Sequence, residues 1–218
     1  MISQQLNDQI TRVGPGSDAG AVLRRYWQPA ALTDELQRGL PLAVNLLGER
    51  LALVKGADGE LVLATRDASA DEAPSFSPDA DDIVLTEGGA SYPAVERNGV
   101  VFAYMGPGAA PAFPDFDCFR APDSHVFAFK GLWECNWLQA LEIGIDPAHA
   151  SFLHRFLEDE DPDDSYGKQF RDRAAQTNMP MTQVLREYPR PEIRVEETDY
   201  GLKIIALRHM ENELTHVR

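Results

Sequence analysis

The sequence predicts an α+β fold in which a β-rich N-terminal module precedes a segment of mixed helix and strand. Residues 42–65 hold three short apolar runs separated by turn residues, which is typical of a β-meander. Residues 106–116 are rich in Pro and Ala, as linkers between modules are. Beyond residue 134 the apolar spacing changes from strand-like to helical. We therefore expect two domains, residues 1–110 and residues 111–218.

The N-terminal module is predicted to open with one short helix and to continue as antiparallel strands. Residues 18–27 have helical spacing with an acceptable Asp cap, and Pro29 ends the helix. Gly48-Glu49 and Asp58-Gly59 divide the meander that follows, and Asp-Gly is a strong hairpin signal. The sequence thus predicts three strands between Leu42 and Thr65.

An acidic stretch, residues 67–82, interrupts this pattern. It contains two prolines and many small residues, so we expect an exposed loop. Apolar alternation then resumes in three further runs. These predicted strands span residues 83–86, 91–95 and 99–105.

The C-terminal part is predicted to alternate between strand and helix. Its expected elements are a strand at 125–133, helix within 134–157, a mobile acidic loop at 158–180, and strands at 192–197 and 201–210. The last strand is long and apolar, and we expect it to lie at a sheet edge. An open edge of this kind favours pairing with another chain, so oligomerisation is expected.

Composition excludes several classes of protein. The 218 residues include 35 acids and 20 bases, giving a formal net charge of -15. The electrostatic field of such a negative charge repels nucleic acid and anionic lipid. Two cysteines, Cys118 and Cys135, are too few for a disulfide framework and favour a reducing cytoplasm. The N-terminus lacks the pattern of a secretory signal, and no apolar run reaches the length of a membrane span.

Residues 142–154 hold the best candidate for chemistry. His149 and His154 lie close to the carboxylates Glu142 and Asp146, and two histidines with one carboxylate form the facial triad that binds Fe(II). In a regular helix, however, a step of five residues turns the two imidazoles about 140° apart. A shared ion therefore requires the helix to widen or break, for which a π-bulge is the usual device. The other interpretation is that Asp146 is an N-cap, Pro147 the first helical residue, and both histidines structural.

A resemblance favours the metal site. The segment ECNWLQALEIGIDPAHASFLH looks like the mononuclear iron motif Asp-x-x-His-x-x-x-x-His of Rieske-type non-haem iron oxygenases, in the phthalate dioxygenase-like oxygenase components, or alpha subunits. The segments RYWQPAAL, NLLGERLALVK, SYPAVERNGVVFAYMGPG and EETDYGLKIIALRHM resemble the same family in the same order. The implied fold is a Rieske-like module followed by the start of a helix-grip catalytic domain.

The resemblance assigns roles to five residues. It implies that His149 and His154 bind iron and that Asp146 links this iron to a cluster histidine of a neighbouring subunit. It places Glu142 and Asn136 against the same site. The implied activity is hydroxylation or demethylation of an aromatic or similar small molecule with O2. The implied partners are a reductase or ferredoxin that donates electrons and, as a trimer, further copies of the chain.

Two departures from the family pattern are visible in the sequence. A Rieske [2Fe-2S] cluster needs Cys-x-His and Cys-x-x-His, and neither Cys118 nor Cys135 has a histidine at those offsets. A segment of several tens of residues is expected to be missing between Arg66 and Pro74. The family's third iron ligand, a carboxylate, comes from a helix beyond the final strands. Glu158, Asp146 or solvent could take its place.

These departures predict a chain that is incomplete and inactive alone. The alternatives are a catalytically silent assembly or decoy subunit and a metal-free structural protein.

Other residues are expected to be structural. Trp27, Trp133 and Trp137 are predicted to lie in the core, and Cys135 to be a small buried hydrophobe. The remaining histidines, at 125, 209 and 216, are not expected to be ligands.

Overall fold

The computed structural model describes residues 2–36, 40–56, 58–67, 82–154, 181–199, 201–210 and 215–217. It is an α+β fold, as the sequence predicts. Contacts divide the chain into two compact units, Met1–Glu134 and Cys135–Arg218. This division falls later in the chain than the expected domain boundary between residues 110 and 111. The expected boundary remains a prediction. The predicted loops at 67–82 and 158–180 lie almost wholly outside the described residues.

Two short helices open the first unit. Helix α1 spans Gln4–Thr11, and helix α2 spans Asp18–Leu23. The Ser17 hydroxyl caps α2 by accepting the Gly20 amide at 3.2 Å, so Asp18 lies in the first turn instead of at the cap. The prediction of a helix over residues 18–27 was too long, because the chain joins the sheet from Gln28. Helix α1 was not predicted.

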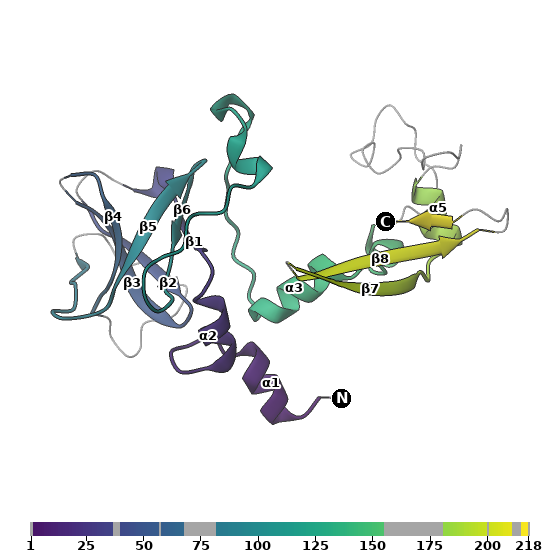
Figure 1. The fold of residues 1–218 in the computed structure, drawn as a ribbon, viewed down its shortest axis with the longest axis horizontal. Helices are drawn as coiled ribbons and strands as arrows, with labels where there is room; N and C mark the ends of the chain where they lie inside the picture. The colour runs from purple at the N-terminus through teal and green to yellow at the C-terminus, as the bar shows by residue number, and fades with distance from the viewer. Residues whose placement is uncertain are drawn as a thin grey trace. The chain divides into compact units, whose positions relative to one another are not determined.

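A six-stranded antiparallel sheet forms the body of this unit (Figure 1). Its order is β1-β6-β5-β4-β3-β2, so the predicted meander is confirmed as three consecutive strands. The sheet curls until its two edge strands, β1 and β2, approach each other. The strands are β1 Gln28–Leu32, β2 Leu42–Leu46, β3 Glu49–Lys55, β4 Leu61–Thr65, β5 Ser91–Arg97 and β6 Val100–Ala103.

Two tight turns fix the register of the hairpins. Leu47 and Gly48 join β2 to β3 with φ of 47° and 76°, and Asn98 and Gly99 join β5 to β6 with φ of 50° and 81°. Two consecutive residues of positive φ match the type I′ turn, whose twist suits a hairpin. Asn-Gly is a typical sequence for this turn, whereas Leu-Gly is not.

The core of the first unit lies within the curl of this sheet. Leu51, Leu53 and Leu63, on β3 and β4, are fully buried. Burial of such side chains contributes roughly 1.5–3 kcal/mol each. The buried cluster also includes Ala31, Val44, Val101, Ala103 and Met105.

Two predicted strands of the sequence are not strands. Of residues 83–86, only Leu85 pairs, through an isolated bridge to Arg66. Residues 125–133 form no strand, and Phe127 and Phe129 are 87% and 78% exposed. The aromatic composition predicted a strand here, but a strand also needs a neighbour to bond its backbone. None of the described segments pairs with this one.

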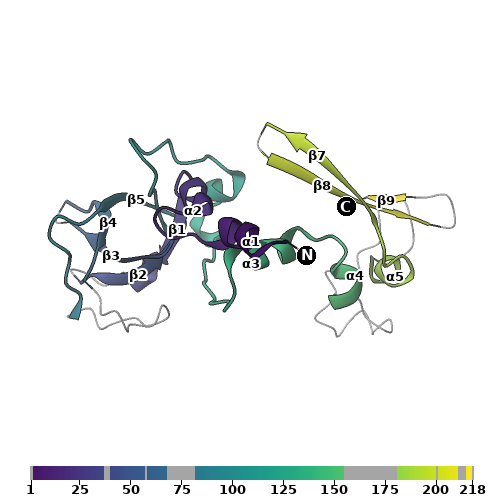
Figure 2. The ribbon, with the colours of Figure 1, turned by 90° about the horizontal axis from the view of Figure 1, so that it is seen from below.

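In its described residues, the second unit combines three short helices with a three-stranded sheet of order β7-β8-β9. Figure 2 shows α4 and α5 beside each other near the β9 end of this sheet. The predicted strands at 192–197 and 201–210 are confirmed as β7 and β8. The elements are α3 Trp137–Ile145, α4 Ala150–Leu153, α5 Met181–Glu187, β7 Glu192–Thr198, β8 Gly201–His209 and β9 Thr215–Val217.

The long strand β8 is central, so the expectation that it forms an edge was wrong. It pairs with β7 over Gly201–Leu207 and with β9 over Leu207–His209, so only one side of Gly201–Ala206 is paired among the described residues. Helix α5 was not predicted. Oligomerisation through this sheet remains a prediction.

Three packing expectations can be compared with the structure. Trp27 is half-buried and packs against Tyr104 and Phe113, with ring centroids 5.8 and 5.6 Å away. Trp133 is 63% exposed and Cys135 is exposed, so placing them in the core was wrong. Trp133 is the last residue of the stretch 125–133, which lacks a strand partner, and Cys135 follows it. None of the helices in the described ranges is long and apolar enough to cross a membrane.

Candidate metal centre

Helix α3 leads into the candidate site, and Asn136 begins it. The Asn136 side chain accepts the Gln139 amide at 3.0 Å, and the Gln139 side chain accepts the Asn136 amide at 3.3 Å. This is a capping box, which satisfies two backbone donors at the start of the helix. The described contacts of Asn136 are thus those of a cap, and its expected place against the iron remains a prediction.

Asp146 both ends α3 and begins the turn that follows. Its amide donates to the Glu142 carbonyl at 3.0 Å, and its carboxylate accepts the amides of Ala148 and His149 at 2.7 and 3.0 Å. A carboxylate is well suited to cap backbone donors in this way. Pro147 cannot continue the backbone ladder of α3, so the helix breaks here.

His149 and His154 stand at the two ends of the short helix α4 and come together. Their ring centroids are 5.2 Å apart, and the ring planes are inclined by 77°. A regular helix would direct the rings apart. No π-bulge is present between them in this described stretch; instead, α4 is one turn long and His154 leaves helical geometry with φ of -114° and ψ of 4°.

The His149 ring is oriented by the backbone before it. Its Nδ1 lies within hydrogen-bond distance of the Asp146 carbonyl oxygen, which can only accept. Nδ1 therefore carries a proton, and in the neutral ring Nε2 is the nitrogen with a lone pair. A carbonyl that holds the other ring nitrogen is the usual way to fix a metal-binding histidine. His149 is half-buried and His154 is exposed.

This pair suits part of an iron site. Two imidazoles at this separation could supply two of the three ligands of a facial triad. Within the described ranges, no group of three or more His, Cys, Asp or Glu side chains is placed to hold a metal ion. Glu158 lies outside those ranges. Glu142 is exposed on α3, and a role for its side chain remains a prediction.

Sequence reasoning missed the side chains that anchor α4. Ser151 and Arg208 are 0% and 1% exposed, and they bond to each other. The available signal was a single arginine inside the apolar run of β8, since an arginine there must be exposed or fully bonded.

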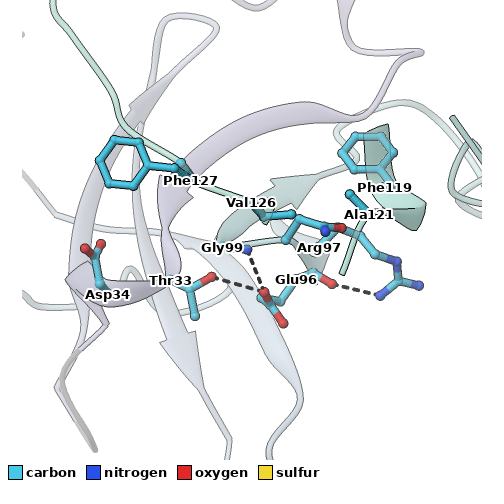
Figure 3. A pocket seen from close by; sticks show the side chains of 11 residues that line it. Thr33, Asp34, Glu96, Arg97, Gly99, Phe119, Ala121, Val126 and Phe127 are labelled. Carbon is cyan, nitrogen blue, oxygen red and sulfur yellow. Dashed lines mark hydrogen bonds between the residues drawn. The ribbon is translucent and has the colours of Figure 1, made fainter. Parts of the chain in front are cut away.

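A cavity of about 750 Å³ belongs to the first unit and contains none of the predicted site residues. Figure 3 shows Glu96 in its floor, where the carboxylate accepts the Gly99 amide at 3.1 Å and the Thr33 hydroxyl at 3.4 Å. Phe127 and Phe119 flank it. The Glu96 carboxylate thus holds the β5–β6 turn in place.

A second cavity, of about 480 Å³, opens beside the end of β4 and is lined in part by Glu49 and Arg66. Glu49 pairs with Arg24 at 2.9 Å and accepts the Tyr92 hydroxyl at 2.8 Å. Burial, followed by the Glu49 carboxylate, raises the pKa of Tyr92 to about 12. Arg66 is buried and donates through Nε to the Leu51 carbonyl at 3.2 Å. Hydrogen bonds and an ion pair thus hold the end of β4, which lies next to the expected missing segment.

The chain resembles known proteins in both sequence and structure. Residues 103–216 match the family model "LigXa C-terminal domain like", which is more than half of the chain. The oxygenase subunit of tert-butanol monooxygenase / tert-amyl alcohol desaturase from Aquincola tertiaricarbonis is 35% identical over 68% of this chain and 38% of that protein. The terminal oxygenase of carbazole 1,9a-dioxygenase from Nocardioides aromaticivorans IC177 is 18% identical, with a TM-score of 0.47, over 89% of this chain and 56% of that one.

A third relative is longer than this chain within the region where the two align. The phthalate 4,5-dioxygenase oxygenase subunit of Pseudomonas putida is 29% identical over 245 aligned positions, 95% of this chain and 53% of that protein. Because the 245 aligned positions cover 95% of the 218 residues of this chain, or about 207 residues, about 38 positions of the alignment have no counterpart in this chain. The chain spans about half the length, or less, of the curated relatives it matches.

Proposed function

Because this chain belongs to the Rieske-type non-haem iron oxygenases, in the phthalate dioxygenase-like group, we propose that it represents part of an oxygenase subunit that holds one Fe(II) through His149 and His154. The observation that carries this proposal is the approach of the two rings to 5.2 Å across a helix too short to keep them apart. The activity proposed for the whole protein is hydroxylation or demethylation of an aromatic or similar small molecule.

The residues around the iron position have separate tasks in this proposal. His149 presents Nε2 because its Nδ1 is held by the Asp146 carbonyl. Asp146 holds the turn through two amides, and Asn136 fixes the start of α3. The third ligand comes from outside the described residues or from solvent. Bound Fe(II) would supply O2 activation, which protein side chains alone do not provide.

A Rieske cluster does not fit this chain. Its two cysteines fall in different units, both are exposed, and neither has a histidine at the spacing that the cluster requires. The unmatched residues of the phthalate dioxygenase relative support a segment missing from within this chain, which the sequence pattern alone assigns to the region near Arg66. Electrons would therefore have to come from another subunit that contains a cluster, supplied in turn by a reductase or ferredoxin. Alone, the chain is expected to bind iron without turnover.

Metal analysis of the purified chain tests the iron site. We expect about one Fe(II) per chain after anaerobic loading, and loss of that iron in His149→Ala and in His154→Ala. His125→Ala is the matched control, because His125 lies in the other unit and is exposed. Intact mass should accompany each measurement to establish that all 218 residues are present.

Two results would contradict the proposal. Wild-type protein of correct mass that binds no specific iron would show that the histidine pair is a remnant, and would favour the silent or structural alternatives. Equal loss of iron in His125→Ala would show that binding is not specific to the pair.

A further inference from the structure

A buried arginine from the sheet reaches the helix that carries the two histidines. Arg208, on β8, is only 1% exposed. Its Nε donates to the Tyr188 carbonyl at 3.1 Å, and its Nη2 donates to the Pro147 carbonyl at 3.1 Å and to the Ser151 hydroxyl at 3.0 Å. These three acceptors are neutral oxygens. A guanidinium placed among them acts as a rigid fork with fixed donor directions.

Two of these acceptors bracket His149 in the sequence. Pro147 precedes it by two residues, in the turn, and Ser151 follows it by two, in α4. One nitrogen of Arg208 therefore joins the turn to the helix across His149. The bond to the Tyr188 carbonyl ties the same side chain to the residue just after α5.

Helix α4 needs such support because it consists of four residues. An isolated helix of this length does not form in water, since nucleation outweighs so few backbone bonds. Its described anchors are the Asp146 cap at one end and the Arg208 bonds along its buried side. Ala150 and Ser151 form that buried side.

We propose that Arg208 is a positioning residue of the metal centre, which holds the turn and α4 together so that His149 keeps Nδ1 on the Asp146 carbonyl and presents Nε2. This inference rests on the proposed iron site for its function, but the orientation of the ring can be measured without metal. A merely structural Arg208 would stabilise the fold and leave the state of the His149 ring unchanged.

The first test is NMR of the metal-free protein labelled with ¹⁵N in histidine, at about pH 8, where imidazoles are ordinarily neutral. Wild-type His149 should give the shifts of a single Nδ1-protonated tautomer. Arg208→Met should shift it toward the mixture of free imidazole, and Arg208→Lys should lie between, because an ammonium lacks the planar fork. Arg194→Met is the matched control, since Arg194 is an exposed arginine of the neighbouring strand β7.

Should Arg208→Met fail to fold, Ser151→Ala decides, because alanine favours helix and removes only one of the three bonds. A single Nδ1-protonated tautomer that persists in folded Arg208→Met, or in Ser151→Ala when only that variant folds, overturns the proposal.

The second test is metal affinity, with Co(II) as the coloured probe. Loss of groups that orient a ligand typically weakens metal binding roughly 10–100-fold. We expect that range for Arg208→Met, a smaller loss for Ser151→Ala, and an unchanged affinity for Arg194→Met. Equal affinities in folded wild type and Arg208→Met would overturn the positioning role. Absence of binding by the wild type would instead refute the iron site, and the NMR result would then decide the role of Arg208 by itself.

Discussion

Replacing Glu49 with Gln should bring the titration of Tyr92 back toward that of an ordinary tyrosine. The pKa of Tyr92 is raised from 10.0 to about 12, first by burial and then by the hydrogen bond and charge of Glu49, while Arg24 opposes the rise. Burial persists in Glu49→Gln, so we expect the pKa of Tyr92 to fall part of the way, between 10.0 and 12. Tyrosinate absorbance, followed in a pH titration, measures this.

The same shift has a consequence for stability. A pKa that is higher in the folded state favours the protonated, folded form, so this contribution is complete below about pH 10 and is lost as the pH rises toward 12. One pKa unit corresponds to about 1.4 kcal/mol, but solvent screens a half-buried ring, and we expect a loss of about 1 kcal/mol. Tyr92→Phe should remove the late step of the titration. A wild-type titration in which all six tyrosines ionise together near pH 10 while the protein stays folded would refute the Arg24–Glu49–Tyr92 network.

Three further predictions concern stability. Leu53→Ala should lower the free energy of unfolding in urea by roughly 2–5 kcal/mol, because Leu53 is 0% exposed, while Val22→Ala at a 57% exposed site should change it by less than about 0.5 kcal/mol. Asn136→Ala should cost about 1 kcal/mol through loss of the α3 cap, and Asn136→Ser should not; equal costs would argue against the cap. His209, then Arg194, lower the pKa of Glu192 below 4.5, so its stabilising contribution is present above that pH and is lost as the pH falls through the lower folded value. The difference in melting temperature between wild type and Glu192→Gln should therefore shrink on acidification, and a difference independent of pH would contradict this pairing.

The sheet of the first unit was predictable because its signals are local. Alternating apolar residues and an Asp-Gly turn specify a hairpin within a few residues, and β2, β3 and β4 follow. The stretch 125–133 failed for the opposite reason. Its aromatic residues favour extended backbone, but a strand is completed by a neighbour, and composition does not show whether one exists. Trp133 and Cys135 were misplaced with it.

The candidate site was predictable in residue type and only partly in geometry. The spacing of His149 and His154 correctly indicated that a regular helix could not bring them together. It did not show that α3 ends at Asp146, or that the helix between the two histidines is a single turn that His154 leaves. Arg208 lies more than 50 residues away in sequence, and pairing over that separation is set by tertiary structure alone.

The contacts described for the histidine pair and its anchors join residues of the second unit. Asp146, Ser151, Tyr188 and Arg208 lie within Cys135–Arg218, whereas the expected missing segment lies near Arg66, in the first unit. Loss of a cluster segment there removes no described contact of the pair. Iron binding should therefore survive perturbation of the first core: Leu53→Ala, loaded at a temperature where it remains folded, should hold the same iron per chain as wild type. Iron that falls in proportion to the stability of the first unit would show that the metal centre depends on the whole fold and not on its local anchors.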